Sequence, residues 1–184
     1  MSKRKILITG IAGNIGEIIL RHLPKDYDIR GLDKVAVEGN DTVVADLSNL
    51  DDILSAFEGI DTVVHLAADP NHQGSWDSNL KNNIIGTRNV YEAARLNNVD
   101  RVIFASSNHT VGYKPLSDDP YKHIYEGNYE RIRHPIDPIS VTEIRPDGYY
   151  GVSKAFGESL GSYFHDEYGV SVICIRIGWV MGSD

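Results

Sequence analysis

The feature that most constrains the fold is a glycine-spaced turn between an apolar strand pattern and the start of a helical pattern. The run Lys5–Ile8 leads into Thr9–Gly16, with glycines at 10, 13 and 16. In a strand-to-helix turn, such glycines let backbone N–H groups and the helix N-terminus approach a pyrophosphate. Successive glycines are three residues apart, which differs from the G-x-G-x-x-G fingerprint. The same physical requirement is met, because no side chain stands where a phosphate approaches or where helix and strand pack. The turn therefore predicts a parallel α/β sheet that binds a dinucleotide, with an ordinary ligand-free turn as the alternative.

The rest of the chain alternates between apolar runs of strand length and segments of helical period, which is typical of a parallel sheet flanked by helices. We expect strands at 4–9, 28–32, 42–45, 61–66, 101–105 and 170–177. We expect the clearest helices, the second with Ser48 as its N-cap, at 14–22, 49–57, 75–97 and 149–168. The predicted fold is an α/β, Rossmann-like, doubly wound parallel sheet in three αβα layers. An irregular, substrate-facing insertion is expected at about 112–148.

Composition narrows the class of protein and partner. With 184 residues and 41% hydrophobic content, the chain is expected to form one domain over 1–184. A net charge of −8 without a basic cluster argues against nucleic-acid binding. Neither a membrane-length apolar stretch nor a signal-peptide core is present, so we expect a soluble, cytoplasmic protein. Cys174 lies in an apolar run and is expected to be a buried thiol, and the scattered histidines predict no metal site.

A proton-transfer set is predicted from Tyr150-x-x-x-Lys154 and from Ser106-Ser107, which follows an apolar strand pattern. A phenol with a reference pKa of about 10 is a poor base at neutral pH. Lys154 lies one helical turn after Tyr150, so its ammonium can favour the phenolate, and the charge of an oxidised nicotinamide would add to this effect. Ser107 would hydrogen-bond the reacting oxygen, and Lys154 would also hold the nicotinamide ribose. These residues together predict a hydride-transfer enzyme.

Two carboxylates are candidate contacts for the adenosine part of a dinucleotide. Asp33 closes the second predicted strand, where a carboxylate can accept hydrogen bonds from the ribose hydroxyls and repel a 2′-phosphate. This favours NAD over NADP, although the neighbouring Lys34 softens the preference. Asp46-Leu47 closes the third strand and is placed to contact the adenine. Capping of the following helix by Asp46 is an equally open interpretation.

At these residues the chain resembles the short-chain dehydrogenase/reductase superfamily, in the extended branch that includes nucleotide-sugar epimerases and dehydratases. The resemblance covers nearly the whole chain and rests on the glycine turn, Asp33, Asp46-Leu47, His65-Leu66-Ala67-Ala68, Asn83-x-x-Gly86-Thr87, Ser106-Ser107 and Tyr150-x-x-x-Lys154. It implies NAD as the cofactor, with His65 packed behind it. The cofactor-binding residues that it implies are Gly10, Ala12, Gly13, Asn14, Ile15, Gly16, Asp33, Lys34, Asp46, Leu47, Leu66, Ala67, Ala68, Asn83, Tyr150 and Lys154.

A closer likeness, to bacterial uronate dehydrogenases and haloarchaeal NAD-dependent glucose-6-phosphate dehydrogenases, lies in residues 104–112, 145–154 and 176–178. It implies oxidation of a cyclic sugar at its anomeric hydroxyl to a lactone, with Tyr150 as the base and Ser107 orienting the hydroxyl. Asn108, His109 and Arg176 would then bind the sugar together with Ser107. Two alternatives stay open: Asn108 and His109 stabilise the loop after a strand, and Arg176 pairs with an internal carboxylate.

The chain also departs from these relatives. Asp69-Pro70-Asn71 stands where uronate dehydrogenases carry a substrate-contacting hydroxyl, which puts a uronate substrate in doubt. The C-terminal substrate subdomain of the extended members is not expected here, whether the chain is a fragment or a natural short form. We expect an exposed apolar patch where that part would pack, and a homodimer. An NADH-retaining epimerase or dehydratase, and a non-catalytic NAD-binding module, remain alternatives to the dehydrogenase.

Overall fold

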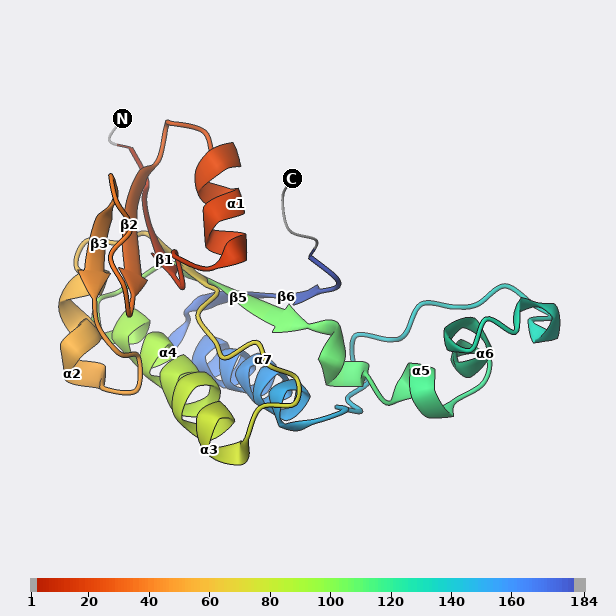
Figure 1. Cartoon of the computed structure of the whole chain (residues 1–184). Helices are drawn as coiled ribbons and strands as arrows, with labels where there is room; N and C mark the ends of the chain where they lie inside the picture. The colour runs from red at the N-terminus through yellow and green to blue at the C-terminus, as the bar shows by residue number, and fades with distance from the viewer. Residues whose placement is uncertain (1–2, 181–184) are drawn as a thin grey trace.

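The computed structural model describes residues 3–180 and contains a six-stranded, fully parallel sheet (Figure 1). The strand order is β3-β2-β1-β4-β5-β6, so the direction of winding reverses between β1 and β4. This confirms the Rossmann-like fold. The strands are β1 (Lys5–Thr9), β2 (Asp28–Asp33), β3 (Asp41–Val44), β4 (Thr62–His65), β5 (Arg101–Ser107) and β6 (Ser171–Ile177).

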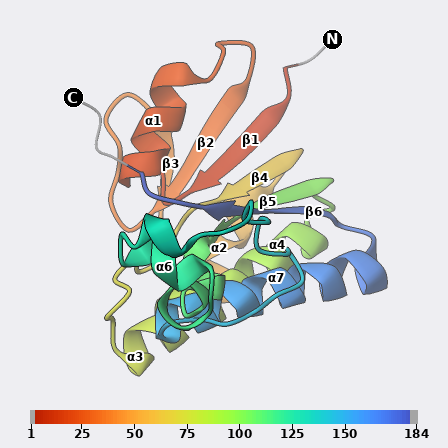
Figure 2. The same ribbon diagram turned by 90° about the vertical axis from the view of Figure 1, so that its right-hand side faces the viewer.

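Helices cover both faces of the sheet (Figures 1 and 2). One face carries α1 (Asn14–His22), and the other carries α2 (Leu50–Ile53), α4 (Gly86–Leu96) and α7 (Tyr149–Tyr168). Side chains alternate along each strand, so β1 directs Leu7 into the larger core and directs Ile6 and Ile8 toward α1. The larger core packs Tyr91 of α4 and Phe164 of α7 against the sheet. Within residues 3–180, no helix has both the length and the apolarity needed to cross a bilayer.

The helix expected at 75–97 forms as three joined segments. These are α3 (Trp76–Ser78), the π-helical segment η2 (Asn79–Ile85) and α4. Ser75 caps the first of them, because its hydroxyl accepts a hydrogen bond from the Ser78 N–H at 3.2 Å. Turns of π-helix are often found at functional sites. Here the π-helical segment contains buried Asn79 and Asn83, and Asn83 contacts the loop that follows β4.

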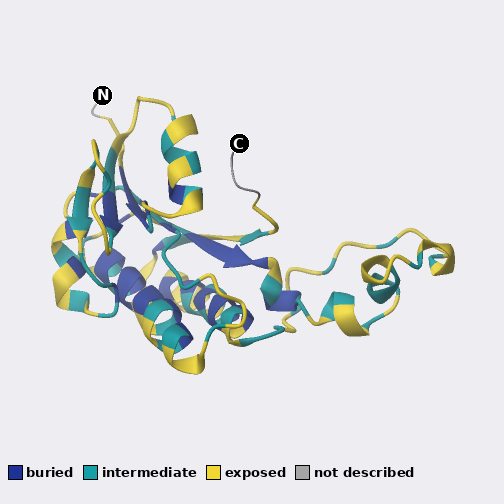
Figure 3. Ribbon diagram, in the orientation of Figure 1, coloured by how far each residue is buried: buried dark blue, intermediate teal, exposed yellow. Residues whose placement is uncertain are grey.

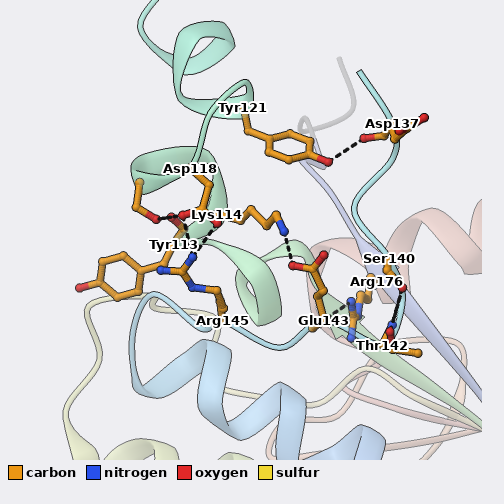
Figure 4. Close-up of polar contacts among 11 residues, drawn as sticks. Tyr113, Lys114, Asp118, Tyr121, Asp137, Ser140, Thr142, Glu143, Arg145 and Arg176 are labelled. Atoms are coloured by element: carbon orange, nitrogen blue, oxygen red, sulfur yellow. Dashed lines mark hydrogen bonds and ion pairs between the residues drawn. The ribbon is translucent and has the colours of Figure 1, made fainter. Parts of the chain in front are cut away.

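Residues 112–148 extend from the sheet as an arm (Figure 1). The arm is not wholly irregular, because it contains the short helices α5 (Lys114–Ser117), α6 (Tyr121–Tyr125) and η4 (Tyr129–Arg131). Most of it is exposed or half-buried, in contrast to β5 (Figure 3). Polar contacts hold it together (Figure 4): Tyr121 Oη donates to the Asp137 carbonyl at 2.8 Å, and Arg145 Nη1 donates to Asp118 Oδ1 at 2.6 Å. These contacts replace the large apolar core that an arm of this size lacks.

The prediction that Ser48 caps the second helix is wrong. The N-cap residue of α2 is Asn49, and the Ser48 N–H instead donates to Asp46 Oδ1 at 2.9 Å. A turn closed by the Asp46 side chain therefore precedes the helix. The helix itself is short and continues as a 3₁₀ segment, η1 (Leu54–Phe57).

The prediction that Cys174 is buried is also wrong, since this residue is exposed on β6. β6 pairs with β5 on one side, and it ends the strand order on the other. Its neighbours Ile173 and Ile175 are 44% and 49% exposed, and Trp179 just beyond the strand is 89% exposed. An apolar run therefore did not imply burial at the margin of the sheet. Ile173 and Ile175 alternate with Cys174 and so share one face of the strand, whereas Trp179 lines the cavity described below; the predicted apolar patch stays a prediction.

Candidate functional site

A cavity of about 880 Å³ lies along the carboxyl ends of β1, β2, β4 and β5. In open parallel sheets, ligands bind outside the carboxyl ends of the strands where the strand order reverses. Here that point lies between β1 and β4. The structure brings most of the predicted site residues to the lining of this one cavity: Gly10, Ala12, Gly13, Asn14, Ile15, Gly16, Asp33, Lys34, Asp46, Leu47, Leu66, Ala67, Ala68, Ser107, Asn108, His109, Tyr150 and Lys154.

The three glycines of the turn have different structural tasks. Gly10 has a φ of +73°, and a Cβ on it would lie 2.7 Å from the Ala67 nitrogen. A Cβ on Gly16 would lie 2.4 Å from the Ile11 carbonyl oxygen. These two glycines therefore allow backbone segments to pack against each other. Gly13 is exposed in the cavity next to the N-terminus of α1, where the absence of a side chain leaves room for a phosphate. The turn fits the pyrophosphate of a dinucleotide.

Asp33 lies at the carboxyl end of β2, beside the glycine turn. Its Oδ2 accepts a hydrogen bond from the Ala12 N–H at 2.9 Å, and its Oδ1 accepts one from the Lys34 N–H at 2.7 Å. A carboxylate oxygen can accept more than one hydrogen bond, so both oxygens keep capacity for ribose hydroxyls. The orientation fits the adenosine ribose of NAD.

Asp46 lies between the cavity and α2, whose N-cap residue is Asn49, and contact of Asp46 with an adenine stays a prediction. It lines the cavity, and it binds the Ser48 N–H ahead of α2. This hydrogen bond, helped by the ammonium groups of Lys81 at 3.1 Å and Lys34 at 3.6 Å, holds the pKa of Asp46 well below its usual range. Lys34 also donates to Asn82 Oδ1 at 2.8 Å. The ammonium of Lys34 is thus held toward Asp46.

Ser107, Tyr150 and Lys154 line the same cavity from two elements. Ser107 is the last residue of β5, and the other two lie in the first turns of α7. The Lys154 Nζ is 5.5 Å from the centre of the Tyr150 ring and donates to the Ala105 carbonyl of β5 at 2.7 Å. Lys154 is 4% exposed and Ser107 is 5% exposed. The tertiary fold therefore assembles a phenol, a hydroxyl and a buried ammonium.

The protein alone does not lower the pKa of Tyr150, contrary to the effect expected from Lys154. Burial raises the pKa of Tyr150, although its hydrogen bond to Ser107 works in the opposite direction. Burial also lowers the pKa of Lys154 to about 8. Desolvation penalises any charged form, so it acts against both the phenolate and the ammonium. A positive charge in the cavity next to the phenol would shift the balance toward the phenolate.

The residues expected to bind a sugar lie in two places. Asn108 and His109 begin the 3₁₀ segment η3 (Asn108–Val111) and line the cavity beside Tyr150. Arg176 instead donates from Nε and Nη2 to Glu158 at 2.8 and 2.7 Å, and it is absent from the described lining of the cavity. The structure thus favours the alternative in which Arg176 pairs with an internal carboxylate. Sugar binding by Asn108 and His109 stays a prediction.

Asn83 and His65 lie behind the cavity wall. Asn83 accepts from the Asp69 N–H at 2.7 Å and donates to Ser153 Oγ at 3.2 Å, which joins the loop after β4 to α7. His65 is 1% exposed, and its ring nitrogens lie 2.7 and 3.0 Å from the hydroxyls of Thr9 and Thr87. Burial lowers the pKa of His65 to about 3, so the ring is neutral. Both residues support cavity-lining segments.

Two carboxylates that hold site residues were not among the residues predicted from the sequence. Asp147 receives a hydrogen bond from His109 Nδ1, and Glu158 binds both Arg176 and Ser106. Their spacing offered a signal, since Asp147 precedes Tyr150 by three residues and Glu158 follows Lys154 by four. Asp147 lies just before α7 and Glu158 lies within it, and spacing along the chain could not show which side chains other elements bring against them.

Comparison with known proteins gives consistent results. Residues 6–184 match the model of the NAD dependent epimerase/dehydratase family. The chain is 42% identical over 180 residues to the L-arabinose 1-dehydrogenase (NAD(P)(+)) of Haloferax volcanii, with 98% of this chain and 68% of that protein covered. It is 38% identical to the NAD-dependent glucose-6-phosphate dehydrogenase of the same organism, with 94% and 67% covered.

Among solved structures, the uronate dehydrogenase of Agrobacterium tumefaciens superposes with a TM-score of 0.80 at 31% identity. This alignment covers all of the present chain and 64% of that structure. The chain therefore spans about two thirds of the length of the relatives it matches. The family model and the identities to these relatives show that the chain belongs to the NAD dependent epimerase/dehydratase family.

Proposed function

We propose that this protein binds NAD and oxidises a cyclic sugar at its anomeric carbon to a lactone. The observation that carries the proposal is the assembly of Ser107, Tyr150 and Lys154 in the cavity that also contains the glycine turn and Asp33. The names of the relatives add support, because they describe sugar dehydrogenases. A fold alone would not carry this conclusion, since the same architecture serves many activities.

The reaction removes a hydride and a proton from the sugar: the anomeric C–H and O–H bonds break and a C=O bond forms. Bound oxidised nicotinamide supplies the hydride acceptor. Tyr150, as the phenolate, takes the proton from the anomeric hydroxyl. Ser107 donates a hydrogen bond to the same oxygen and holds it near the phenol. Lys154, anchored by the Ala105 carbonyl, places a positive charge 5.5 Å from the phenol ring.

The substrate that we propose first is a neutral aldose. Identity to the arabinose dehydrogenase, at 42%, exceeds identity to the uronate dehydrogenase of Pseudomonas syringae, at 34%. Asp69 also lines the cavity, and its negative charge contributes to the raised pKa of Tyr150. A carboxylate in this position disfavours an anionic sugar by repulsion. Sugar acids and sugar phosphates rank below aldoses for this reason.

A nucleotide-sugar epimerase or dehydratase is the second candidate. It is supported by 29% identity over 97% of the chain to a protein of Methanocaldococcus jannaschii named as a putative UDP-glucose 4-epimerase. Such an enzyme returns the hydride and retains its cofactor. NAD that stays bound through purification, without net reduction by any free sugar, would favour this candidate over the dehydrogenase.

The test is NAD reduction, followed at 340 nm, with L-arabinose, glucose, galacturonate and glucose 6-phosphate. Tyr150→Phe should lower the turnover number by about 10²- to 10⁴-fold, the range for loss of a general base, while NAD binding persists. Tyr149→Phe is the matched control, because Tyr149 is the adjacent phenol and is 52% exposed. Equal turnover in the wild type and Tyr150→Phe would refute the assignment of the base.

We further propose that the protein forms a homodimer. Trp76 and Tyr149 are exposed and in edge-to-face contact at the start of α3 and α7, and they offer an apolar surface for a second copy. Phe164, by contrast, is 4% exposed and belongs to the core. Light scattering of the purified chain would give the mass directly, and a monomeric mass at micromolar concentration would refute the proposal.

A further inference from the structure

His109 and Asp147 form a side-chain pair at the cavity wall. His109 Nδ1 lies 2.9 Å from Asp147 Oδ1 and 2.8 Å from Asp147 Oδ2. The imidazole is 31% exposed and lines the cavity, whereas the carboxylate is 21% exposed and absent from the described lining. The carboxylate therefore binds Nδ1 from the side of the ring away from the cavity, and the other ring nitrogen, Nε2, stays available to a ligand.

The surroundings fix this pair in position. A Cβ on Gly112 would lie 2.0 Å from Asp147 Oδ2, so the carboxylate occupies space that only glycine leaves open. The His72 ring stacks on His109 at 5.6 Å with 9° between the planes, and the Tyr150 ring meets it edge-on at 5.6 Å. Backbone hydrogen bonds from Arg145 N–H to the Thr110 carbonyl, at 2.8 Å, and from Tyr113 N–H to the Arg145 carbonyl, at 3.1 Å, attach the Asp147 segment to η3.

A carboxylate accepts hydrogen bonds and cannot donate them when ionised. Nδ1 must therefore carry the proton, and in a neutral imidazole Nε2 is then an acceptor. Among the described residues, the hydrogen bonds of His109's ring all involve Nδ1. Nε2 remains for a ligand, and a hydroxyl can donate to it whereas a carboxylate or a dianionic phosphate cannot.

We propose that Asp147 is a positioning residue that holds His109 in the Nδ1–H tautomer, so that Nε2 accepts a hydrogen bond from a sugar hydroxyl. This inference rests on the proposed function, and it adds to the proposed sugar site a hydrogen-bond acceptor beside Tyr150 that only a donor such as a hydroxyl can use. Asp147 itself does not touch the sugar. It determines that His109 Nε2 is the acceptor, and the sugar hydroxyl the donor, of the hydrogen bond at the cavity wall.

The tautomer can be measured without any turnover. Long-range ¹H–¹⁵N spectra of ¹⁵N-histidine-labelled protein distinguish the two neutral tautomers and the imidazolium, and His109→Asn assigns the signal. We expect the Nδ1–H tautomer in the wild type and a shift toward the Nε2–H tautomer in Asp147→Ala. Gly112→Ala should shift the tautomer in the same direction by displacing the carboxylate. Adding L-arabinose should move the Nε2 resonance of the wild type only.

Kinetics give the second readout. Loss of one neutral hydrogen bond should raise the KM for the aldose about tenfold in Asp147→Ala, with a smaller change in kcat. Asp119→Ala is the matched control, because it removes the carboxylate from another His–Asp pair, in which His123 Nε2 lies 3.4 Å from Asp119 Oδ1 outside the cavity. This control should leave both the His109 spectrum and the KM unchanged.

Three outcomes would overturn the proposal: an imidazolium or an Nε2–H tautomer in the wild type, an unchanged tautomer in Asp147→Ala, or an unchanged KM despite a changed tautomer. The proposed function fails separately, if the wild type reduces NAD with none of the sugars. In that case the spectra with and without L-arabinose still decide whether Asp147 orients His109 toward a sugar hydroxyl.

Discussion

The buried ammonium of Lys154 makes a prediction about stability that needs neither cofactor nor sugar. Lys154 is 4% exposed, and burial lowers its pKa from 10.5 to about 8. Below pH 8 the lysine is protonated in both the folded and the unfolded chain, so folding bears the full cost of burying a charge. Between about pH 8 and 10.5 the unfolded chain still binds the proton and the folded chain releases it. Stability contributed by this group therefore rises with pH in that window.

The size of the effect follows from the pKa shift. At 1.36 kcal/mol per unit, the change from 10.5 to about 8 corresponds to roughly 3 kcal/mol in the free energy of unfolding. Lys154→Met replaces the ammonium with an apolar group of similar length. Urea unfolding of both proteins from pH 7 to pH 9.5 should show the wild type gaining about 2 kcal/mol relative to the variant. The difference between the proteins removes the titration of groups that they share.

The free energy of unfolding of Lys154→Met at a single pH is a poorer measure of the pKa shift than the change with pH in the difference between the two proteins. The variant also loses the hydrogen bond from Nζ to the Ala105 carbonyl, which offsets part of the gain from removing a buried charge. A difference that stays constant from pH 7 to pH 9.5, or that falls, would show that folding does not lower the pKa of Lys154. The account of its burial would then be wrong.

Two further changes test the cofactor side of the cavity. Gly16→Ala should lower the free energy of unfolding by about 2 kcal/mol or more, because the new Cβ would lie 2.4 Å from the Ile11 carbonyl oxygen and the backbone must shift. Thermal unfolding measures the loss of stability, and an unchanged midpoint temperature would refute the prediction. Asp33→Asn should reduce the preference for NAD over NADP about tenfold, or roughly 1.4 kcal/mol, because the carboxylate no longer repels a 2′-phosphate. The ratio of the kcat/KM values for NAD and NADP measures this preference, and an unchanged ratio would show that other residues set it.

Much of the fold could be predicted from the sequence, because its signals are local. Apolar runs, glycine spacing and helical period located the six strands and the longer helices within a few residues. Local signals failed where distant segments decided the outcome. Cys174 is exposed because β6 ends the sheet order, which no run of apolar residues records. The arm at 112–148 contains short helices that its composition did not reveal.

For the candidate site too, some properties could be predicted from the sequence and others depend on tertiary packing. Residue types such as Tyr150, Lys154 and Ser107 were identifiable because their chemistry and spacing are properties of the chain. Their electrostatics were not, since burial depends on what packs around them and it reverses the pKa change expected for Tyr150. The tertiary structure also pairs Arg176 with Glu158 across 18 residues.

The sequence by itself determined the parallel sheet, the dinucleotide turn and the set of reactive groups, because each depends on the types and spacing of residues that are near one another in the chain. Only the tertiary structure decided which groups share a cavity, which are desolvated and which are held by a partner. His109 and Asp147, 38 residues apart, show the reason: two polar groups interact only at hydrogen-bond distance, and folding alone brings them there.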